Sequence, residues 1–411
     1  MKTVAIVGGG FCGTVVAAQL LSRSEDPICV RLFDRTGTFG AGIAYTTDEP
    51  NHFLNVPAAK MSALEGQPDH FTDWLRANKI DIGDGFLLRR VYRRYLQSLL
   101  RQPPRNPGSE MSLHPEAVVA LEGGFRLRTA SGQSYRVDEV VLATGYFANS
   151  RFDALSPFEP GRWPTQAQRA IVIGSGLSAL DGAASVLARF PHAEVTLLSR
   201  HGQIAEPFVA AAPCTLSTPP ATVRGIVRWL RNEIERAGCW VAVFDAMRPC
   251  WNDLWLTLSE TDRRRFLRHL RPLFDRHRHR VPPGQAAALA PYWNSGQLRL
   301  LRGEAISATP GEVTLRDGCL LKADLVLDAS GANFDWTQSD DPLVGQLMAS
   351  GQVRPGPLNM GIFADASGRL APHLYTLGPP LRGVQWETTA VPELRRQADQ
   401  ICSTILRSPD V

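Results

Sequence analysis

The amino-acid sequence predicts an α/β protein in which one strand–turn–helix–strand unit occurs twice. The first copy opens with the apolar run 3–7, which passes into the turn Gly8-Gly-Gly-Phe-Cys-Gly13 and then into a helix rich in alanine, valine and leucine. A further apolar strand, 28–33, ends at Asp34. Continuous apolar strands of this kind are typical of a parallel sheet with both faces covered.

The second copy begins near residue 170. An apolar strand again leads into a glycine turn, Gly174-Ser-Gly-Leu-Ser-Ala179, which is followed by a helix and by strand 194–198. Two other strands, 138–145 and 324–331, end in the related triplets Ala-Thr-Gly and Ala-Ser-Gly. We therefore expect two Rossmann-like dinucleotide-binding domains.

The order of the segments indicates that the second domain is inserted into the first. A linker rich in proline and glycine precedes the second copy, and a last strand and long helix near the C-terminus return to the first sheet. We predict a first domain from residues 1–160 and 315–411 and a second domain from residues 161–314. Within the latter, residues 203–297 are expected to form a helical insert, with helices over 223–237 and 260–274.

Composition narrows the class of protein. The 411 residues are 44% hydrophobic, enough for two cores, because a single core stops growing at roughly 250–300 residues. The net charge of +4 is modest, and no basic stretch interleaved with aromatic residues indicates nucleic-acid binding. No apolar run suits a membrane helix, the N-terminus does not resemble a secretion signal, and no cysteine pair suggests a metal site. We expect a cytoplasmic protein.

The first turn follows the pattern G-x-G-x-x-G with its full context: a strand before it, a helix after it and an acid about 20 residues further on. The unpaired N–H groups and the positive end of the helix dipole suit a diphosphate, and Asp34 suits the adenosine ribose hydroxyls. We predict that this turn binds FAD. The residues expected to contact FAD in this half of the chain are Gly8, Gly10, Phe11, Cys12, Gly13, Asp34, Arg35, Thr144 and Gly145.

The second turn, Gly174-x-Gly176-x-x-Ala179, has alanine in the third position. The strand after it ends in Ser199-Arg200-His201 and lacks a carboxylate, which favours the 2′-phosphate of NADPH over the free ribose of NADH. An arginine that only faces solvent is the other interpretation of Arg200. The residues predicted to bind the nicotinamide cofactor are Gly174, Gly176, Ser178, Ala179 and Arg200.

Two further segments are candidates for flavin contact. The stretch 40–63 carries glycines at 40 and 42 that permit close approach to a flat ring, and Asn55 is expected to hydrogen-bond it. Its His52 is more simply read as structural than as catalytic. At the other end of the chain, Gly378 and Thr388 flank the predicted start of the last helix, whose N-terminus would stabilise negative charge on the flavin.

The chain also carries a strongly basic tract, residues 263–280, which is interpreted either as a solvated helix face or as an anchor for a phosphate or an anionic substrate. No cysteine pair of the C-x4-C type follows the first unit, since residues 37–63 contain no cysteine. Disulfide reduction of the glutathione-reductase type is therefore not expected.

At these residues the chain resembles a known family, the bacterial FAD/NAD(P)-binding oxidoreductases related to flavin-dependent monooxygenases. The resemblance rests on both glycine turns and on the stretches GAGIAY…HFLNVPAAKMS, RRRFLRHLRPLFDRHRHR and GVQWETTAVPELR, which span nearly the whole chain. It implies hydroxylation of a small, polar, nitrogen-containing molecule. Urate hydroxylation is the first expectation, and N-hydroxylation of an amino acid such as aspartate is the second.

The leading hypothesis is thus a monooxygenase that consumes NADPH or NADH and dioxygen together with a small-molecule substrate, with no nucleic-acid or membrane partner. The flavin would carry the redox chemistry, which fits the lack of a catalytic triad or metal cluster in the sequence and leaves no catalytic side chain to name. Two other functions fit the same motifs: an NAD(P)H-dependent reductase or oxidase, and a redox-sensing flavoprotein. The oligomeric state is left open.

Overall fold

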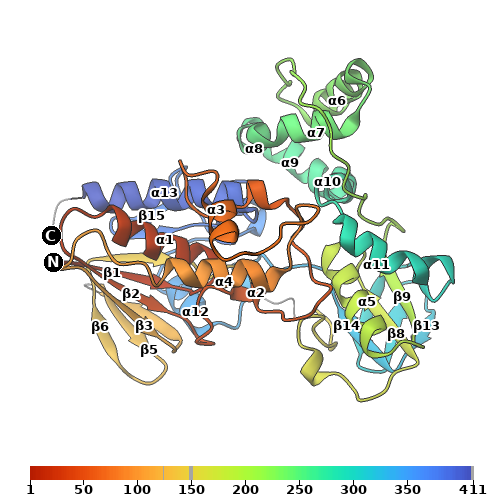
Figure 1. Ribbon diagram of the computed structural model, residues 1–411, viewed down its shortest axis with the longest axis horizontal. Coiled ribbons are helices and arrows are strands. Elements are labelled where there is room, and N and C mark those ends of the chain that lie inside the picture. The colour runs from red at the N-terminus through yellow and green to blue at the C-terminus, as the bar shows by residue number, and fades with distance from the viewer. Residues whose placement is uncertain (124, 148–150, 409–411) are drawn as a thin grey trace. The chain divides into compact units, whose positions relative to one another are not determined.

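The computed structural model describes residues 1–123, 125–147 and 151–408 (Figure 1). The chain divides into two compact units. The first unit comprises residues 1–47, 57–147 and 333–411, and the second comprises residues 48–56 and 148–332. The chain therefore passes between the units four times.

A six-stranded sheet forms the centre of the first unit, in the order β15-β16-β7-β1-β2-β3. All neighbouring strands are parallel except β15 and β16, which are antiparallel. The strands are β1 (Lys2–Val7), β2 (Ile28–Phe33), β3 (Glu110–His114), β7 (Glu139–Leu142), β15 (Arg369–Ala371) and β16 (Leu374–Thr376). The inner strands β1, β2 and β7 are almost wholly buried, as their apolar sequences predict.

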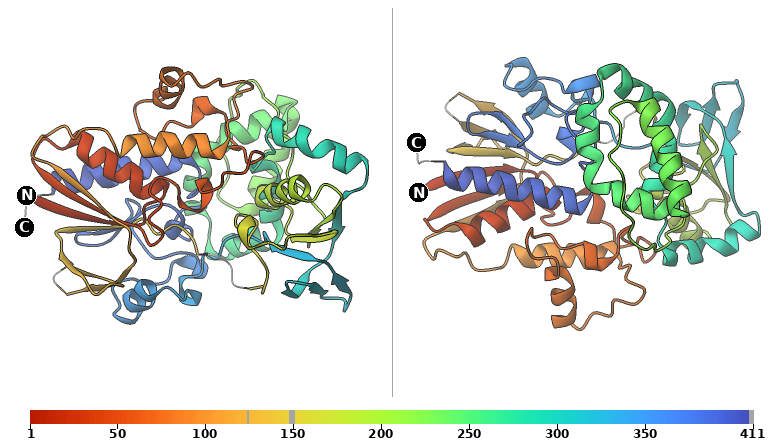
Figure 2. Two further views of the ribbon diagram at one scale, coloured as in Figure 1. Left: turned by 60° about the horizontal axis from the view of Figure 1, so that its bottom comes forward. Right: turned by 90° about the horizontal axis from the view of Figure 1, so that it is seen from above.

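Helices α1 (Phe11–Arg23) and α13 (Val391–Arg407) lie side by side on one face of this sheet (Figures 1 and 2). An ion pair of 2.8 Å between Arg23 and Asp399 joins them. Lys2 donates to the carbonyl of Ile405 at 3.0 Å, so β1 is joined to the last turn of α13. The same unit contains α2 (Gly42–Tyr45), α3 (His70–Ala77), α4 (Arg89–Leu99) and α12 (Pro342–Ala349).

The second unit repeats the strand order of the first. Its sheet has the order β14-β8-β9-β10, which corresponds to β7-β1-β2-β3. Its strands are β8 (Arg169–Ile173), β9 (Glu194–Ser199), β10 (Leu298–Arg302) and β14 (Leu325–Asp328), and α5 (Leu177–Arg189) follows β8. The predicted doubling of one α/β unit is confirmed.

The repeat includes a feature that the sequence analysis missed. In each unit a three-stranded antiparallel sheet precedes the strand that ends in Ala-Thr-Gly or Ala-Ser-Gly. In the first unit these strands are β4 (Val118–Glu122), β5 (Arg126–Thr129) and β6 (Ser134–Arg136). In the second they are β11 (Ala305–Thr309), β12 (Glu312–Leu315) and β13 (Leu320–Lys322).

The helical insert has its own small aromatic core. Phe274 packs edge-on against Trp251 at 4.9 Å and against Phe266 at 5.7 Å (ring centroids). Figure 2 shows these helices, drawn in green, gathered together. They are α6 (Val223–Ala237), α7 (Trp240–Met247), α8 (Trp251–Thr257), α9 (Glu260–Arg265) and α10 (Arg271–Arg278), followed by α11 (Pro283–Asn294).

Three expectations differ from the structure. The helix expected over 260–274 is interrupted by a π-helical turn, Phe266–Leu270, and Pro272 then opens α10. The unit boundaries fall at 147/148 and 332/333 rather than at 160/161 and 314/315, because β14 pairs with β8 and so keeps residues up to 332 in the second unit. Residues 48–56 also belong to the second unit.

Among the described helices, none is both long enough and apolar enough to cross a lipid bilayer.

Leu32 and Leu113 provide a matched test of the first core. They are register partners on the adjacent strands β2 and β3, yet Leu32 is fully buried and Leu113 is 43% exposed. We expect Leu32→Ala to lower the free energy of unfolding of the first unit by about 2–5 kcal/mol, through lost burial and a residual cavity. Leu113→Ala should change it by less than about 0.5 kcal/mol. Urea unfolding followed by circular dichroism measures both, and equal losses would contradict the assigned sheet.

Candidate functional site

The first glycine turn is shaped by a close approach of two strands. Gly8 donates to the carbonyl of Phe33 at 2.8 Å and has a φ of +113°. A Cβ at Gly8 would lie 2.2 Å from the carbonyl oxygen of Ala143, and one at Gly13 would lie 1.9 Å from the oxygen of Gly8. Only glycine fits at either position, as the motif predicts.

Asp34 is held at this turn. One of its carboxylate oxygens accepts from the N–H of Gly9 at 2.9 Å, and the other accepts from the N–H of Thr36 at 2.9 Å. The next residue, Arg35, is exposed and pairs with Asp341 at 3.2 Å. The structure thus places Asp34 beside the turn and directs Arg35 to a carboxylate of the protein itself.

The predicted residues from distant parts of the first unit meet at this turn. A Cβ on Gly378 would lie 2.9 Å from the Sγ of Cys12 and 3.8 Å from the carbonyl oxygen of Thr388. Thr388 is fully buried, and it lies before α13, which begins at Val391. Thr144 and Gly145 directly follow β7, at the same edge of the sheet.

The residues at this edge fit FAD. The buried hydroxyls of Thr144 and Thr388 have no hydrogen-bond partner among the described residues. Buried polar groups are nearly always satisfied, so two such hydroxyls beside a glycine turn suit a ligand that supplies polar atoms there. Gly8, Gly10 and Gly13 would hold its diphosphate, and Asp34 would hold its ribose.

Sequence reasoning missed a group of tyrosines near this turn. Burial raises the pKa of Tyr45 and of Tyr146, and the nearby Arg89 guanidinium only partly offsets the effect. Burial likewise raises the pKa of Cys12 to about 12. Such groups are largely protonated at pH 7 even at their ordinary pKa values, and burial moves these three further from ionisation. The available signal was position, since Tyr146 directly follows Gly145 and Tyr45 ends the GAGIAY stretch.

The second turn reproduces the first. Gly174 donates to the carbonyl of Leu198 at 2.8 Å and has a φ of +131°. A Cβ there would lie 2.3 Å from the carbonyl oxygen of Ala329, the counterpart of Ala143. Ala179 is fully buried in the place of the third glycine, whereas no described atom lies within 4 Å of a Cβ on Gly176.

Two charged residues border the second turn. Arg200 is exposed just beyond β9, and it is one of the cations that lower the pKa of Glu304, although Arg316 has the larger effect. Asp328 ends β14 beside the turn, and one of its oxygens is buried without a hydrogen-bond partner among the described residues. The sequence analysis did not single out Asp328. It could have been noticed because it places a carboxylate where the first copy of the unit has Leu142.

Asn55 lies in the segment 48–56 and therefore belongs to the second unit, whereas the other residues predicted to contact FAD belong to the first. Its neighbour His52 is fully buried. The Nε2 atom of His52 lies 2.9 Å from the hydroxyl of Ser185 and 3.1 Å from the carbonyl oxygen of Asp181. These contacts favour the structural interpretation of His52.

Trp386, which lies in the GVQWETTAVPELR stretch, is 3% exposed. The guanidinium of Arg382 stacks 3.7 Å from the centre of its ring and also donates to its backbone carbonyl. This stacking fixes the segment that leads to Thr388.

Most arginines of the basic tract are paired within the second unit. Arg263 stacks on Trp255, with 5.2 Å between the guanidinium carbon and the ring centre. The ion pairs are Arg264–Glu260, Arg265–Asp262, Arg271–Asp275, Arg276–Glu206 and Arg280–Asp245. Most of these arginines therefore pair with carboxylates of neighbouring helices and loops of the same unit. This pairing favours a structural role for the tract over the binding of an anion.

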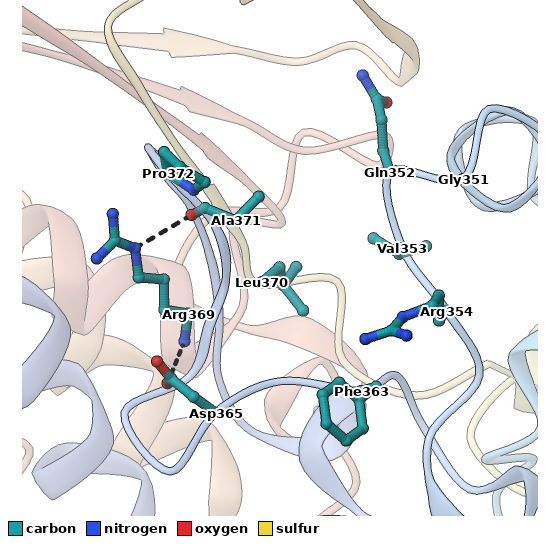
Figure 3. Close-up of a pocket in the computed structure, with 10 residues that line it drawn as sticks. All are labelled: Gly351, Gln352, Val353, Arg354, Phe363, Asp365, Arg369, Leu370, Ala371 and Pro372. Carbon is teal, nitrogen blue, oxygen red and sulfur yellow. Dashed lines mark hydrogen bonds between the residues drawn. The ribbon is translucent and has the colours of Figure 1, made fainter.

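A cavity of about 490 Å³ lies elsewhere in the first unit, between β15 and the segment 351–354 (Figure 3). The guanidinium of Arg354 lies 5.0 Å from the ring centre of Phe363, while Arg369 points the other way and donates to Ala371. None of the predicted site residues lines this cavity.

Substitutions at Gly174 and Gly176 test the folding of the second turn and its ligand binding separately. Gly174→Ala should destabilise the second unit, because its Cβ would clash with the Ala329 carbonyl. Gly176→Ala should leave the melting temperature within about 2 °C, yet weaken NADP⁺ binding roughly tenfold or more, since the methyl group would face the diphosphate. Differential scanning fluorimetry and calorimetric titration measure the two effects. Unchanged binding in Gly176→Ala would exclude the turn as the nicotinamide site.

Comparison with known proteins is consistent with this geometry. A family model described as FAD-NAD(P)-binding matches residues 5–147, which contain β1, the first turn, β2 and β7. The prediction of an FAD/NAD(P)-binding region at the N-terminus is thereby confirmed. A search of the curated proteins finds no match.

Solved structures share the fold over their whole length. An ornithine N-hydroxylase from Kutzneria sp. 744 is 16% identical with a TM-score of 0.64, covering 99% of both chains. An L-lysine 6-monooxygenase from Pseudomonas syringae is 15% identical with a TM-score of 0.63, covering 100% of both. A bacillithiol disulfide reductase from Staphylococcus aureus is 14% identical with a TM-score of 0.58, covering 99% of both. The chain therefore has the fold common to these oxidoreductases, and its residues 5–147 match the FAD-NAD(P)-binding family model.

Proposed function

We propose that this chain is an FAD-dependent monooxygenase that consumes NAD(P)H and hydroxylates the nitrogen of an amino acid. The observation that carries the proposal is the duplicated turn. Gly8 approaches Ala143 in the first unit as Gly174 approaches Ala329 in the second, and each turn opens a helix whose N–H groups suit a diphosphate. Two such turns on one chain suit two dinucleotides, one as resident cofactor and one as electron donor.

The side chains at the first turn bind and orient rather than react. Thr144 and Thr388 offer hydroxyls to a bound cofactor, and burial moves the pKa values of Tyr45 and Tyr146 further above neutral pH. When bound, FAD supplies the transfer of electrons from NAD(P)H to dioxygen. The overall reaction balances as follows: NADPH, a proton, dioxygen and an amine give NADP⁺, water and a hydroxylamine.

Between the two substrates expected from the sequence, we favour an amino acid over urate. Two of the structures that share the fold over nearly their whole length are named as ornithine and lysine hydroxylases. Urate hydroxylation, the first expectation from the sequence, receives no comparable support. Ornithine, lysine and aspartate are therefore the first substrates to test.

A reductase without hydroxylation is the second candidate, because the bacillithiol disulfide reductase has the same fold. The absence of cysteine from residues 37–63 argues against a disulfide relay of the C-x4-C type in this chain. A small-molecule acceptor would then take the electrons.

The proposed function predicts that the FAD-loaded protein oxidises NADPH several-fold faster with its amino-acid substrate than without it. Oxygen-dependent formation of a product heavier by one oxygen atom should accompany this oxidation. Absorbance at the NADPH band measures the oxidation, mass spectrometry of the amino acid measures the product, and a hydrogen peroxide assay measures the oxygen that is reduced without hydroxylation. Urate, with oxygen-free buffer as a further control, belongs in the same panel.

Three results would contradict the monooxygenase. NADPH consumption that yields only hydrogen peroxide with every substrate would indicate an oxidase, and consumption that needs another acceptor would indicate a reductase. Retained FAD without any NADPH or NADH turnover would indicate a redox sensor.

The position of Arg200 leads us to expect that the protein prefers NADPH over NADH. Arg200→Ala should raise the KM for NADPH roughly tenfold, because a charge-assisted hydrogen bond to the 2′-phosphate would be lost, and should leave the KM for NADH unchanged. Arg299→Ala is the control, since Arg299 is an exposed arginine of the same sheet that lies 3.8 Å from Glu194. Equal effects on both nucleotides would mean that Arg200 only faces solvent.

A further inference from the structure

One short segment of the chain, outside both glycine turns, connects the two units. Residues 48–56, here termed the strap, belong to the second unit, whereas the residues before and after them belong to the first. The strap is neither helix nor named strand, and its residues 52, 54, 56 are buried while 51, 53, 55 are half-buried. Such alternation indicates that residues 51–56 are packed, whereas residues 48 and 50 at the start of the strap are exposed.

His52 fixes the strap to α5. Its ring is fully buried, with Nε2 between the hydroxyl of Ser185 and the carbonyl oxygen of Asp181. Both residues lie on α5, the helix that begins at the second glycine turn with Gly176 as its N-cap. The strap is therefore attached to the helix whose N-terminus would hold the nicotinamide dinucleotide.

Two further contacts join the strap and α5 to α11. Phe53 lies against the start of α11, where a Cβ on Gly284 would be 3.2 Å from its ring. The neighbouring Gln285 donates to the buried carboxylate of Asp181 at 2.6 Å. Buried polar networks that join several segments are costly to disturb, because each remaining group loses its partner.

The chain on either side of the strap also has close contacts within the first unit. Before it, Gly42 packs against the first turn, with a Cβ on Gly42 only 3.1 Å from the Cα of Gly10. After it, Ala58 donates to the carbonyl of Gly85 at 2.8 Å, and the hydroxyl of Tyr92 donates to the carbonyl of Met61 at 2.8 Å. The strap thus links the second turn's helix to a residue that touches the first turn.

We propose that His52 is a positioning residue that couples occupancy of the second glycine turn to the conformation of the first. A dinucleotide on the N-terminus of α5 would fix that helix and, through Ser185 and Asp181, the strap. The strap transmits the restraint along the chain to Gly42 and so to Gly10. The inference rests on the proposed function only in requiring that the second turn binds a nicotinamide dinucleotide.

Hydrogen–deuterium exchange of the FAD-loaded full-length protein, with and without NADP⁺, tests the coupling without turnover. In the wild-type protein, NADP⁺ should slow exchange at residues 177–189 and also at residues 40–47. In His52→Ala the first protection should persist and the second should be lost. His52→Gln, whose amide nitrogen can stand near the position of Nε2, should restore part of it, and His192→Ala, an exposed histidine just beyond α5, should behave as wild type.

Ser185→Ala gives the same test with a nearly isosteric change, should His52→Ala fold poorly. Both variants should keep their FAD content and bind NADP⁺ within about twofold of wild type, while reduction of FAD by NADPH slows roughly tenfold. Protection of residues 40–47 that persists in both variants, or that is absent from the wild type, overturns the coupling. Failure of NADP⁺ to bind wild-type protein by calorimetry overturns the proposed function, and the coupling with it.

Discussion

The contact on which both units depend is the approach of a glycine Cα to the backbone carbonyl of a neighbouring strand. At Gly8 and at Gly174 any side chain would collide with that carbonyl, and both residues adopt a positive φ that other residues resist. The approach lets the turn close tightly, so the following helix starts directly above the sheet with its free N–H groups at the strand ends. The proposed diphosphate site is therefore a consequence of how closely the strands pack.

The sequence predicted this part of the molecule well, because the determinants are local. A glycine turn between an apolar strand and an apolar helix specifies its own geometry, and strand 28–33 and helix 223–237 have the predicted bounds. The remainder depends on partners distant in the chain. Nothing near residue 48 indicates that His52 packs on Ser185, and the boundary near 332 follows from the pairing of β14 with β8.

The difference between local determinants and distant partners also explains why the roles of the basic tract and of Arg35 could not be predicted. Charge runs are visible in a sequence, but their carboxylate partners are not. Glu206 pairs with Arg276 and Asp341 pairs with Arg35, each from a segment far along the chain. Surface ion pairs of this kind contribute little stability individually, and their main consequence is that the arginines are occupied. Arg200, whose neighbouring Glu304 is held by Arg316, is better placed to meet a phosphate.

Ionisable groups near the two turns differ in a way that suits their proposed roles. Around the first turn, burial raises the pKa values of Cys12, Tyr45 and Tyr146, so these groups are neutral neighbours of the Asp34 carboxylate. Beside the second turn, Asp328 lies at the end of β14 and Arg200 is exposed just beyond β9. A resident cofactor is held best by many fixed neutral contacts, because these depend little on pH or salt. A dinucleotide that binds and leaves in each cycle is served by exposed charge, which speeds encounter and still permits release.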